Sequence, residues 1–302
     1  MSAQADSLKS ILFALGANFA IAVAKTGGAI FTGSSSMLAE AIHSYADCGN
    51  QALLIWGLRE AKGAPTADHP LGFGKAIYFW SFIVALMLFS MGGLFSIYEG
   101  VHKLHATEPV KYAWVAVAIL SFGAIAESVS LWGCLREVDK GRGEQTLWQW
   151  FRSSRQSELL VVLGEDLAAL GGLVLALGFI GLSMLTGNPM WDAVGSIAIG
   201  VLLVIVAALV GVEVKALLVG QSAEPQVVVA MRAHVAAQPE VAQLYNLLTQ
   251  QLGSEIMLAV KARMTPQRSD VALVEAINRV EKSLREKFPQ LRWIFFEPDI
   301  QD

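Results

Sequence analysis

One helical face of an apolar stretch carries an unusual row of polar side chains. Glu40, His43, Asp47 and Asn50 follow one another at spacings of three, four and three residues, which places them on one face of an α-helix. An ionisable side chain in mid-membrane costs about 2.5–3.5 kcal/mol, so several on one stripe need a compensating partner. His43 and Asp47, at positions i and i+4, can both reach one cation, and imidazole with carboxylate is a donor set that Zn²⁺ accepts. The stripe predicts an intramembrane metal site; the alternative is a polar stripe that hydrogen-bonds to neighbouring helices without metal.

Two further apolar stretches contain carboxylates. Glu165 and Asp166 lie within VVLGEDLAALGG, and Glu127 lies within GAIAESVS. Adjacent helical residues point about 100° apart, so at most one of Glu165 and Asp166 faces the same ion squarely. Glu127 is a candidate for the transport path, with a buried carboxylate that hydrogen-bonds to a neighbouring helix as the alternative.

The elements that must position these side chains are apolar segments of membrane-spanning length. About 20 residues of helix cross roughly 30 Å of hydrocarbon. The segments long enough are Ile11–Phe31, Met37–Leu58, Ile77–Val101, Ala113–Leu135, Leu159–Leu185 and Met190–Leu218. The sequence therefore predicts a polytopic α-helical membrane protein with six transmembrane helices.

The composition agrees with a membrane protein. Of 302 residues, 54% are hydrophobic and 16% are charged, whereas an average soluble domain carries about 25% charged residues. This balance argues against a disordered chain, a nucleic-acid binder and a small disulfide-stapled domain. Cys48 and Cys134 lack the spacing of a zinc knuckle or a redox pair. The first residues show no cleavable signal, so we expect the first apolar segment to remain as a membrane helix.

Lys and Arg near the ends of the segments predict the orientation. Most of them, among them Arg59, Arg136 and Lys215, fall on the side of the N-terminus, and few, such as Lys103, fall on the other side. Because cytoplasmic loops carry the excess of positive charge, both termini are predicted to be cytoplasmic. Lys25 lies inside the first segment, and we expect it to snorkel to the outer side.

The composition changes after Lys215. Residues 224–238 and 270–287 have helical patterns, and residues 241–251, 254–264 and 291–296 have strand patterns. Ile256, Leu258, Val260 and Ala262 alternate as expected for a strand with one buried face. An α-β-β-α-β order predicts a two-layer α+β domain with its helices on one face of a sheet. We therefore expect a transmembrane domain over residues 1–218 and a cytoplasmic domain over residues 219–302.

Three motifs resemble those of a known family. They are SMLAEAIHSYADCGNQALLIWGL, ADHPLGFGKAIYFWSF and WDAVGSIAIGVLL, and they resemble the cation diffusion facilitator family over nearly the whole chain. The resemblance implies six transmembrane helices, a cytoplasmic ferredoxin-like C-terminal domain, a homodimer, and export of a divalent metal against protons. VVLGEDLAALGG, the glutamate in AESVS and TGNPMWDAVGS are most similar to the branch that contains the zinc transporter nine proteins.

The family's transport site pairs two ligands four residues apart on helix two with two on helix five. Helix two matches at His43 and Asp47. On helix five the family's His and Asp positions fall on Val161 and Glu165 in one register, and on Val162 and Asp166 in the other. In both registers a valine replaces the histidine, so one ligand is missing. Glu40, Asn50, the second carboxylate or a water are candidates to complete the site.

A second metal site of the family also departs from its pattern. The turn after helix two retains His69, but the second histidine of the family's loop site falls on Phe73. We therefore expect this loop site to be absent. The C-terminal segment likewise lacks the ligands with which some family members bind zinc there.

Together these features predict a transporter and not an enzyme. We expect proton-coupled efflux of a divalent metal by alternating access, with His43, Asp47, Glu165 and Asp166 as metal ligands and no prosthetic group. Zinc is the leading candidate, although Mn²⁺, Fe²⁺, Co²⁺ and Ni²⁺ accept the same donors. His43 is the natural proton carrier, because histidine titrates closest to neutrality. No HExxH motif supports a metalloenzyme.

The expected setting is a bacterial inner (plasma) membrane. The partners expected there are the metal ion, protons, the lipid bilayer and a second copy of the chain, and no nucleic acid. The alternative function is that of a transport-inactive relative, kept as a structural or regulatory membrane partner. It is motivated by the missing helix-five histidine.

Overall fold

The protein is described by a computed structural model, which covers residues 18–104 and 112–301. The chain divides into two compact units. The first contains the long apolar helices. The second contains the chain from Val214 onward, together with the loop Gly57–Phe79 and the segment Gln145–Ser157.

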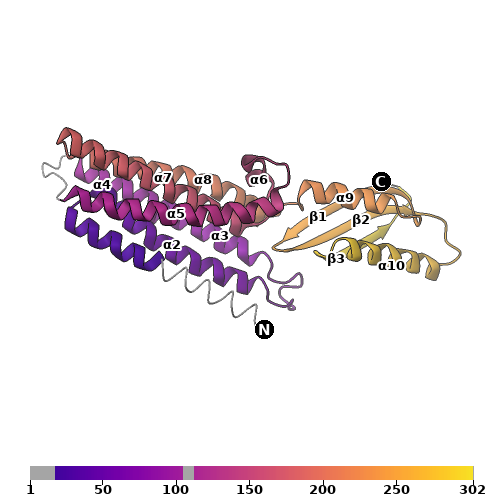
Figure 1. Cartoon of the computed structure of the whole chain (residues 1–302). Coiled ribbons are helices and arrows are strands. Elements are labelled where there is room, and N and C mark those ends of the chain that lie inside the picture. Colours follow the sequence, from indigo (N-terminus) through magenta and orange to yellow (C-terminus); the bar gives the residue numbers. More distant parts are fainter. Residues whose placement is uncertain (1–17, 105–111, 302) are drawn as a thin grey trace, which may run out of the picture. The chain divides into compact units, whose positions relative to one another are not determined.

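The first unit is a bundle of long helices that lie side by side (Figure 1). A helix covers the described residues 18–32, and residues 11–17 of the first predicted segment lie outside the described residues. The other long helices are α2 (Ser35–Glu60), α5 (Ala113–Arg142), α7 (Ser157–Thr186), α8 (Met190–Val219) and the continuous helix α3 (Ala76–Met87), η1 (Leu88–Leu94) and α4 (Phe95–Lys103).

Four helices of the described chain are long and apolar enough to cross a membrane: Ala76–Lys103, Ala113–Arg142, Ser157–Thr186 and Met190–Val219. Each contains one of the segments predicted from the sequence. Helix α2 has sufficient length at 26 residues, but the polar stripe that includes Glu40, His43 and Asp47 lowers its hydropathy. A helical membrane domain is therefore supported, and the number of six spans stays a prediction.

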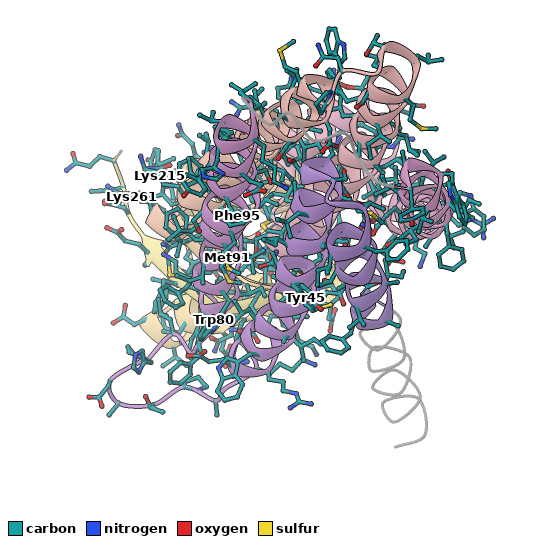
Figure 2. All side chains as sticks on the ribbon, turned by 90° about the vertical axis from the view of Figure 1, so that its left-hand side faces the viewer. Tyr45, Trp80, Met91, Phe95, Lys215 and Lys261 are labelled. Atoms are coloured by element: carbon teal, nitrogen blue, oxygen red, sulfur yellow. The ribbon has the colours of Figure 1, made fainter. Side chains whose placement is uncertain are left out.

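The outer surface of the bundle is apolar. Met91 on η1 and Leu185 on α7 expose 44% and 86% of their surface, and Tyr45 on α2 also lies at the surface (Figure 2). Only 17% of the most apolar stretch of α5 is buried inside the chain. A contiguous apolar surface of this kind is stable in lipid and not in water.

The segment η1 is a π-helical insertion in an otherwise α-helical span, a feature the sequence did not predict. It packs closely against α8, because a Cβ atom at Gly93 would lie 3.3 Å from the carbonyl oxygen of Gly200. The hydroxyl of Ser96 donates to the carbonyl of Gly92 at 2.6 Å, satisfying an acceptor next to the irregular turn. Single π-turns inside α-helices occur frequently at functional sites.

A short helix that the sequence analysis did not predict lies between the fourth and fifth predicted spans. Helix α6 (Leu147–Ser153) begins with a capping box, in which the side chains of Thr146 and Gln149 each accept from the other's backbone N–H. The spacing T-x-x-Q is the signal that identifies such a start. Arg155 then donates to the carbonyl of Ser222 at 2.7 Å, within the second unit.

The C-terminal part has the predicted α-β-β-α-β order. It comprises α9 (Pro225–Ala236), β1 (Val241–Leu252), β2 (Glu255–Met264), α10 (Asp270–Lys287) and β3 (Leu291–Pro298). The sheet order is β1-β2-β3, with β1 antiparallel and β3 parallel to β2. The alternation predicted for β2 is confirmed, since Ile256, Leu258, Val260 and Ala262 are at most 2% exposed. They form one core with residues of both helices, including Met231 and Val280.

The loop before α3 and the first turn of α3 contact the β1–β2 turn. Tyr78 Oη accepts a hydrogen bond from the backbone N–H of Gly253 at 2.9 Å, and Tyr78 is fully buried. The backbones of Gly74 and Gly253 approach so closely that a side chain at either position would collide with the other residue. Gly253 also has a φ of +67°, which favours glycine.

Candidate metal site

The polar stripe of α2 faces the interior of the bundle. His43 is 1% exposed, and its Nδ1 lies 3.5 Å from Oδ1 of Asp47, one turn further along. Within the described residues, neither ring nitrogen of His43 has a hydrogen-bond partner, and neither has Asp47 Oδ1. Buried polar atoms without partners are costly, by about 1–3 kcal/mol each. His43 Nδ1 and Asp47 Oδ1, which face each other, are two donors that one cation could satisfy, while Nε2 points to the other side of the ring.

Helix α7 brings one carboxylate to this stripe. Asn50 Nδ2 donates a hydrogen bond of 2.5 Å to Glu165 Oε1, and both residues are buried. Asn50 is one turn beyond Asp47, and the charges of Asp47 and Glu165 interact electrostatically. Val161, the position one turn before Glu165, is 1% exposed. The face of α7 that carries Val161 and Glu165 is thus buried, and Glu165 on it contacts α2.

Asp166 is oriented differently. Its carboxylate accepts from the hydroxyl of Ser130 on α5, with both oxygens 3.3 Å from Ser130 Oγ. Glu127, one turn before Ser130, is half-buried and interacts electrostatically with Asp47 and Asp166. The two adjacent carboxylates of α7 therefore face different helices, as their 100° separation requires.

The predicted ligands do not form one closed cluster. Over the described ranges 18–104 and 112–301, no three His, Cys, Asp or Glu side chains are grouped so as to hold one metal ion. The structure brings His43 and Asp47 together and Glu165 next to Asn50, and it places Asp166 against α5. The ligand set His43, Asp47, Glu165 and Asp166 stays a prediction.

The expectation that Lys25 snorkels outward is wrong. Its side chain is fully buried, and Nζ lies 3.1 Å from Glu40 Oε2 and 2.9 Å from Ser44 Oγ. The ammonium of Lys25 is stabilised inside the bundle because the buried carboxylate of Glu40 neutralises its charge there. The sequence contained both residues, but their spacing along the chain does not show that the two helices face each other here.

The π-helical segment lies beside His43. A Cβ atom at Gly92 would be 3.8 Å from His43 Nδ1, so the absence of a side chain leaves space on that side of the ring. Gly92 belongs to η1, whereas the turn before α3 that carries His69 belongs to the second unit. His69 is exposed, and its ring lies 4.5 Å from that of Phe73, the residue at the family's second histidine position.

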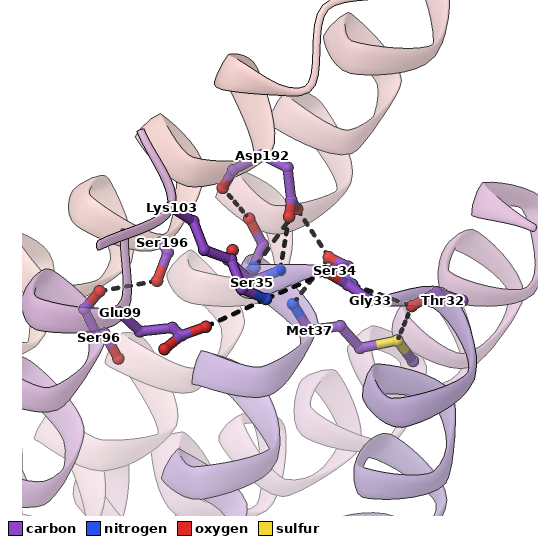
Figure 3. Close-up of polar contacts among 11 residues, drawn as sticks. Thr32, Gly33, Ser34, Ser35, Met37, Ser96, Glu99, Lys103, Asp192 and Ser196 are labelled. Atoms are coloured by element: carbon purple, nitrogen blue, oxygen red, sulfur yellow. Dashed lines mark hydrogen bonds and ion pairs between the residues drawn. The ribbon is translucent and has the colours of Figure 1, made fainter. Parts of the chain in front are cut away.

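A second polar cluster fixes the start of α2. The buried carboxylate of Asp192 on α8 accepts from the hydroxyl of Ser34 at 2.7 Å and from the backbone N–H groups of Ser35 and Ser36 at 2.5 and 3.3 Å (Figure 3). The hydroxyl of Ser36 donates back to the carbonyl of Asp192 at 2.8 Å. An acidic side chain from another helix thus caps the N-terminus of α2, where N–H groups lack partners within the helix.

A lysine extends this cluster to a third helix. Lys103, at the end of α4, donates to the carbonyl of Gly33 at 3.2 Å and pairs with Glu99 at 3.1 Å (Figure 3). Gly33 itself has a φ of +72° and forms the turn before α2. The WDAVGS motif could be recognised in the sequence, but its contact with the turn before α2 depends on how the two helices are placed in space.

The comparisons with known proteins agree with this architecture. The family model of the cation efflux transmembrane domain matches residues 11–219. The chain belongs to the cation diffusion facilitator family. Cation diffusion facilitators are integral membrane transporters, so the match supports the helical bundle as a transport domain.

Several members of this family are similar to the chain. The proton-coupled zinc antiporter SLC30A9 of Xenopus laevis, described as mitochondrial, is 34% identical over 226 residues, 74% of this chain and 40% of the relative. Metal tolerance protein C4 of Arabidopsis thaliana is 32% identical over 222 residues, 73% of this chain and 49% of the relative. The zinc transporter ZitB of Pectobacterium atrosepticum is 24% identical over 257 residues, 84% of this chain and 75% of the relative. The chain thus spans about half or less of the SLC30A9 and C4 relatives.

Proposed function

We propose that this chain exchanges a divalent transition-metal cation, with zinc as the leading candidate, for protons across its membrane by alternating access. The metal ligands in this proposal are His43, Asp47 and Glu165, with Asp166 as the next candidate. The observation that carries it is the unpartnered state of both His43 nitrogens and of Asp47 Oδ1 inside the bundle. Two of the similar proteins are named as zinc transporters, which supports zinc.

Proton coupling follows from the chemistry of these donors. A metal ion binds neutral imidazole and ionised carboxylates, so binding releases any protons that these groups hold. Protons that arrive from the other side of the membrane compete for the same atoms and expel the metal. His43 is the proposed proton carrier, since a histidine changes charge in the physiological pH range.

A binding titration of the purified full chain with Zn²⁺ tests the ligand assignment. We expect saturable binding by the wild type and a loss of at least about tenfold in affinity in His43→Ala and Asp47→Ala, because each removes a ligand. His234→Ala is the matched control, since His234 lies in the C-terminal domain and bonds to Ser283. Unchanged affinity in the two stripe variants would refute the assignment.

The alternative is a transport-inactive relative that serves as a structural or regulatory partner. The valine at the family's histidine position, Val161 or Val162 according to the register, favours it, because the site then lacks one ligand that family members use. Binding of Zn²⁺ without any flux in proteoliposomes would support this alternative. Proton-dependent flux would exclude it.

The remaining expectations belong to the same proposal. The chain is a transporter and not an enzyme, it binds its cargo transiently, and it functions as a homodimer with both termini in the cytoplasm. The proposed location is a bacterial inner membrane. The SLC30A9 relatives are described as mitochondrial, so localisation of the tagged protein in its source cells is the test of this point.

A further inference from the structure

A buried ion pair lies next to the candidate metal site. Lys25 and Glu40 both have side chains that are 0% exposed, and they approach to 3.1 Å. Ser44 accepts a second hydrogen bond from the ammonium at 2.9 Å. Lysine and glutamate are almost never fully buried unless they are paired, so each residue requires the other.

Glycines on the neighbouring helices leave space for the side chains of Lys25 and Glu40. A Cβ atom at Gly172 of α7 would collide with Glu40 Oε1, and one at Gly123 of α5 would lie 3.4 Å from Lys25 Cε. Within the described residues, Glu40 Oε1 has no hydrogen-bond partner. Glu40 therefore has one oxygen engaged by the ammonium and a second, buried oxygen that has no partner among the described residues, and that would be available to a cation only if Lys25 released the carboxylate.

The pair is electrostatically connected to the predicted ligands. Glu40 precedes His43 by one turn on the same stripe, and the charges of Lys25 and Glu40 both act on His43 and Asp47. The charge of Lys25 also acts on Glu127 of α5. In this low-dielectric interior a unit charge interacts strongly with other charges over several ångströms. Lys25 therefore repels a metal ion at the stripe, whereas Glu40 attracts it.

We propose that Lys25 is a tethered counter-cation, which occupies Glu40, keeps this carboxylate out of the metal's coordination sphere and thereby limits the affinity of the site. The inference rests on the proposed function and deepens it. A transporter must release its cargo, and a site with an additional unneutralised carboxylate holds a divalent cation more tightly. Lys25 is thus a positioning residue that acts through Glu40, not a ligand.

A double-mutant cycle tests the proposal by Zn²⁺ titration of the full chain in detergent at constant pH. We expect Lys25→Met to bind Zn²⁺ at least about tenfold more tightly than the wild type, because the carboxylate of Glu40 is then released. Glu40→Gln should bind Zn²⁺ at least about tenfold more weakly, because the charge of Lys25 then has no counter-charge. The double variant should return to within about threefold of the wild type, because both charges are removed together. A role in folding alone would not tighten binding.

Transport kinetics give a second readout. In proteoliposomes Lys25→Met should lower both the KM and the maximal rate for Zn²⁺, since tighter binding slows release. Lys140→Met is the control, because it removes a lysine that pairs with Glu137 in an exposed position on α5, and its affinity should stay within about twofold of the wild type.

Two results distinguish failure of this inference from failure of the proposed function. If His43→Ala weakens binding at least about tenfold but Lys25→Met binds no more tightly than the wild type, the tethered-cation role is refuted and the metal site stands. If His43→Ala binds like the wild type, the metal site itself is refuted. Should Lys25→Met alone not fold, Glu40→Gln and the double variant decide: the role is refuted unless Glu40→Gln binds at least about tenfold more weakly than the wild type and the additional Lys25→Met change restores the affinity to within about threefold.

Discussion

The carboxylate of Asp192 on α8 caps the start of α2. It accepts three hydrogen bonds from the start of α2, two of them from backbone N–H groups, and is only 3% exposed. Asp192→Ala leaves these two N–H groups buried without acceptors, at about 1–3 kcal/mol each, while the hydroxyl of Ser34 can rotate toward another acceptor. We therefore expect the free energy of unfolding to fall by about 2–6 kcal/mol. Asp192→Asn retains one acceptor oxygen and should lose about half as much.

The assay is reversible unfolding of the detergent-solubilised chain by sodium dodecyl sulfate, followed through the fluorescence of its eight tryptophans. Ser196→Ala is the matched control on the same helix, since its hydroxyl makes a single hydrogen bond of 2.7 Å to the carbonyl of Ser96. This control should cost less than about 1 kcal/mol. If Asp192→Ala costs no more than Ser196→Ala, the hydrogen bonds of Asp192 to the start of α2 stabilise the protein no more than a single ordinary hydrogen bond does.

Three further predictions concern other sites. Val161→His adds an imidazole one turn before Glu165 and should tighten Zn²⁺ binding by about tenfold in the same titration, whereas unchanged affinity would contradict the register that places the family's histidine position at Val161. Tyr78→Phe removes the acceptor of the Gly253 N–H, and hydrogen exchange at that amide should accelerate. Arg279 donates to Glu240 at 2.8 Å and holds the pKa of that carboxyl below its usual range, so the pair adds stability above the unfolded-state pKa and loses it on acidification. Glu240→Gln should therefore lose less unfolding free energy between pH 7 and pH 3 than the wild type does.

Most of the fold could be predicted because it depends on patterns local to each segment. The long apolar runs identified the helices α3–α4, α5, α7 and α8, and strict alternation identified β2 with its buried face. Helix α6 was missed although Thr146 and Gln149 carry its start signal, because seven residues are too few for a clear hydrophobic period. The π-helical turn of η1 left no local signal, since its irregular backbone is stabilised by packing against α8.

The candidate site was predictable only within each helix. The stripe from Glu40 to Asn50 follows from helical periodicity, which the sequence contains. Contacts between helices depend on how each helix is rotated about its axis, and one residue of rotation moves a side chain by 100°. For this reason the sequence left Glu165 and Asp166 as alternatives, whereas the structure shows Asn50 bonded to Glu165. The burial of Lys25 could not be predicted for the same reason.

The central claim is that the stripe of α2 binds a metal ion that the protein exchanges for protons. The most direct test is uptake of Zn²⁺, compared with Mn²⁺, Fe²⁺ and Co²⁺, into proteoliposomes under an imposed pH gradient, with the wild type and Asp47→Ala. We predict uptake that depends on the gradient for the wild type and uptake at the level of empty liposomes for Asp47→Ala. Undiminished flux in Asp47→Ala, or no flux of any of these ions through folded wild-type protein, would contradict the claim.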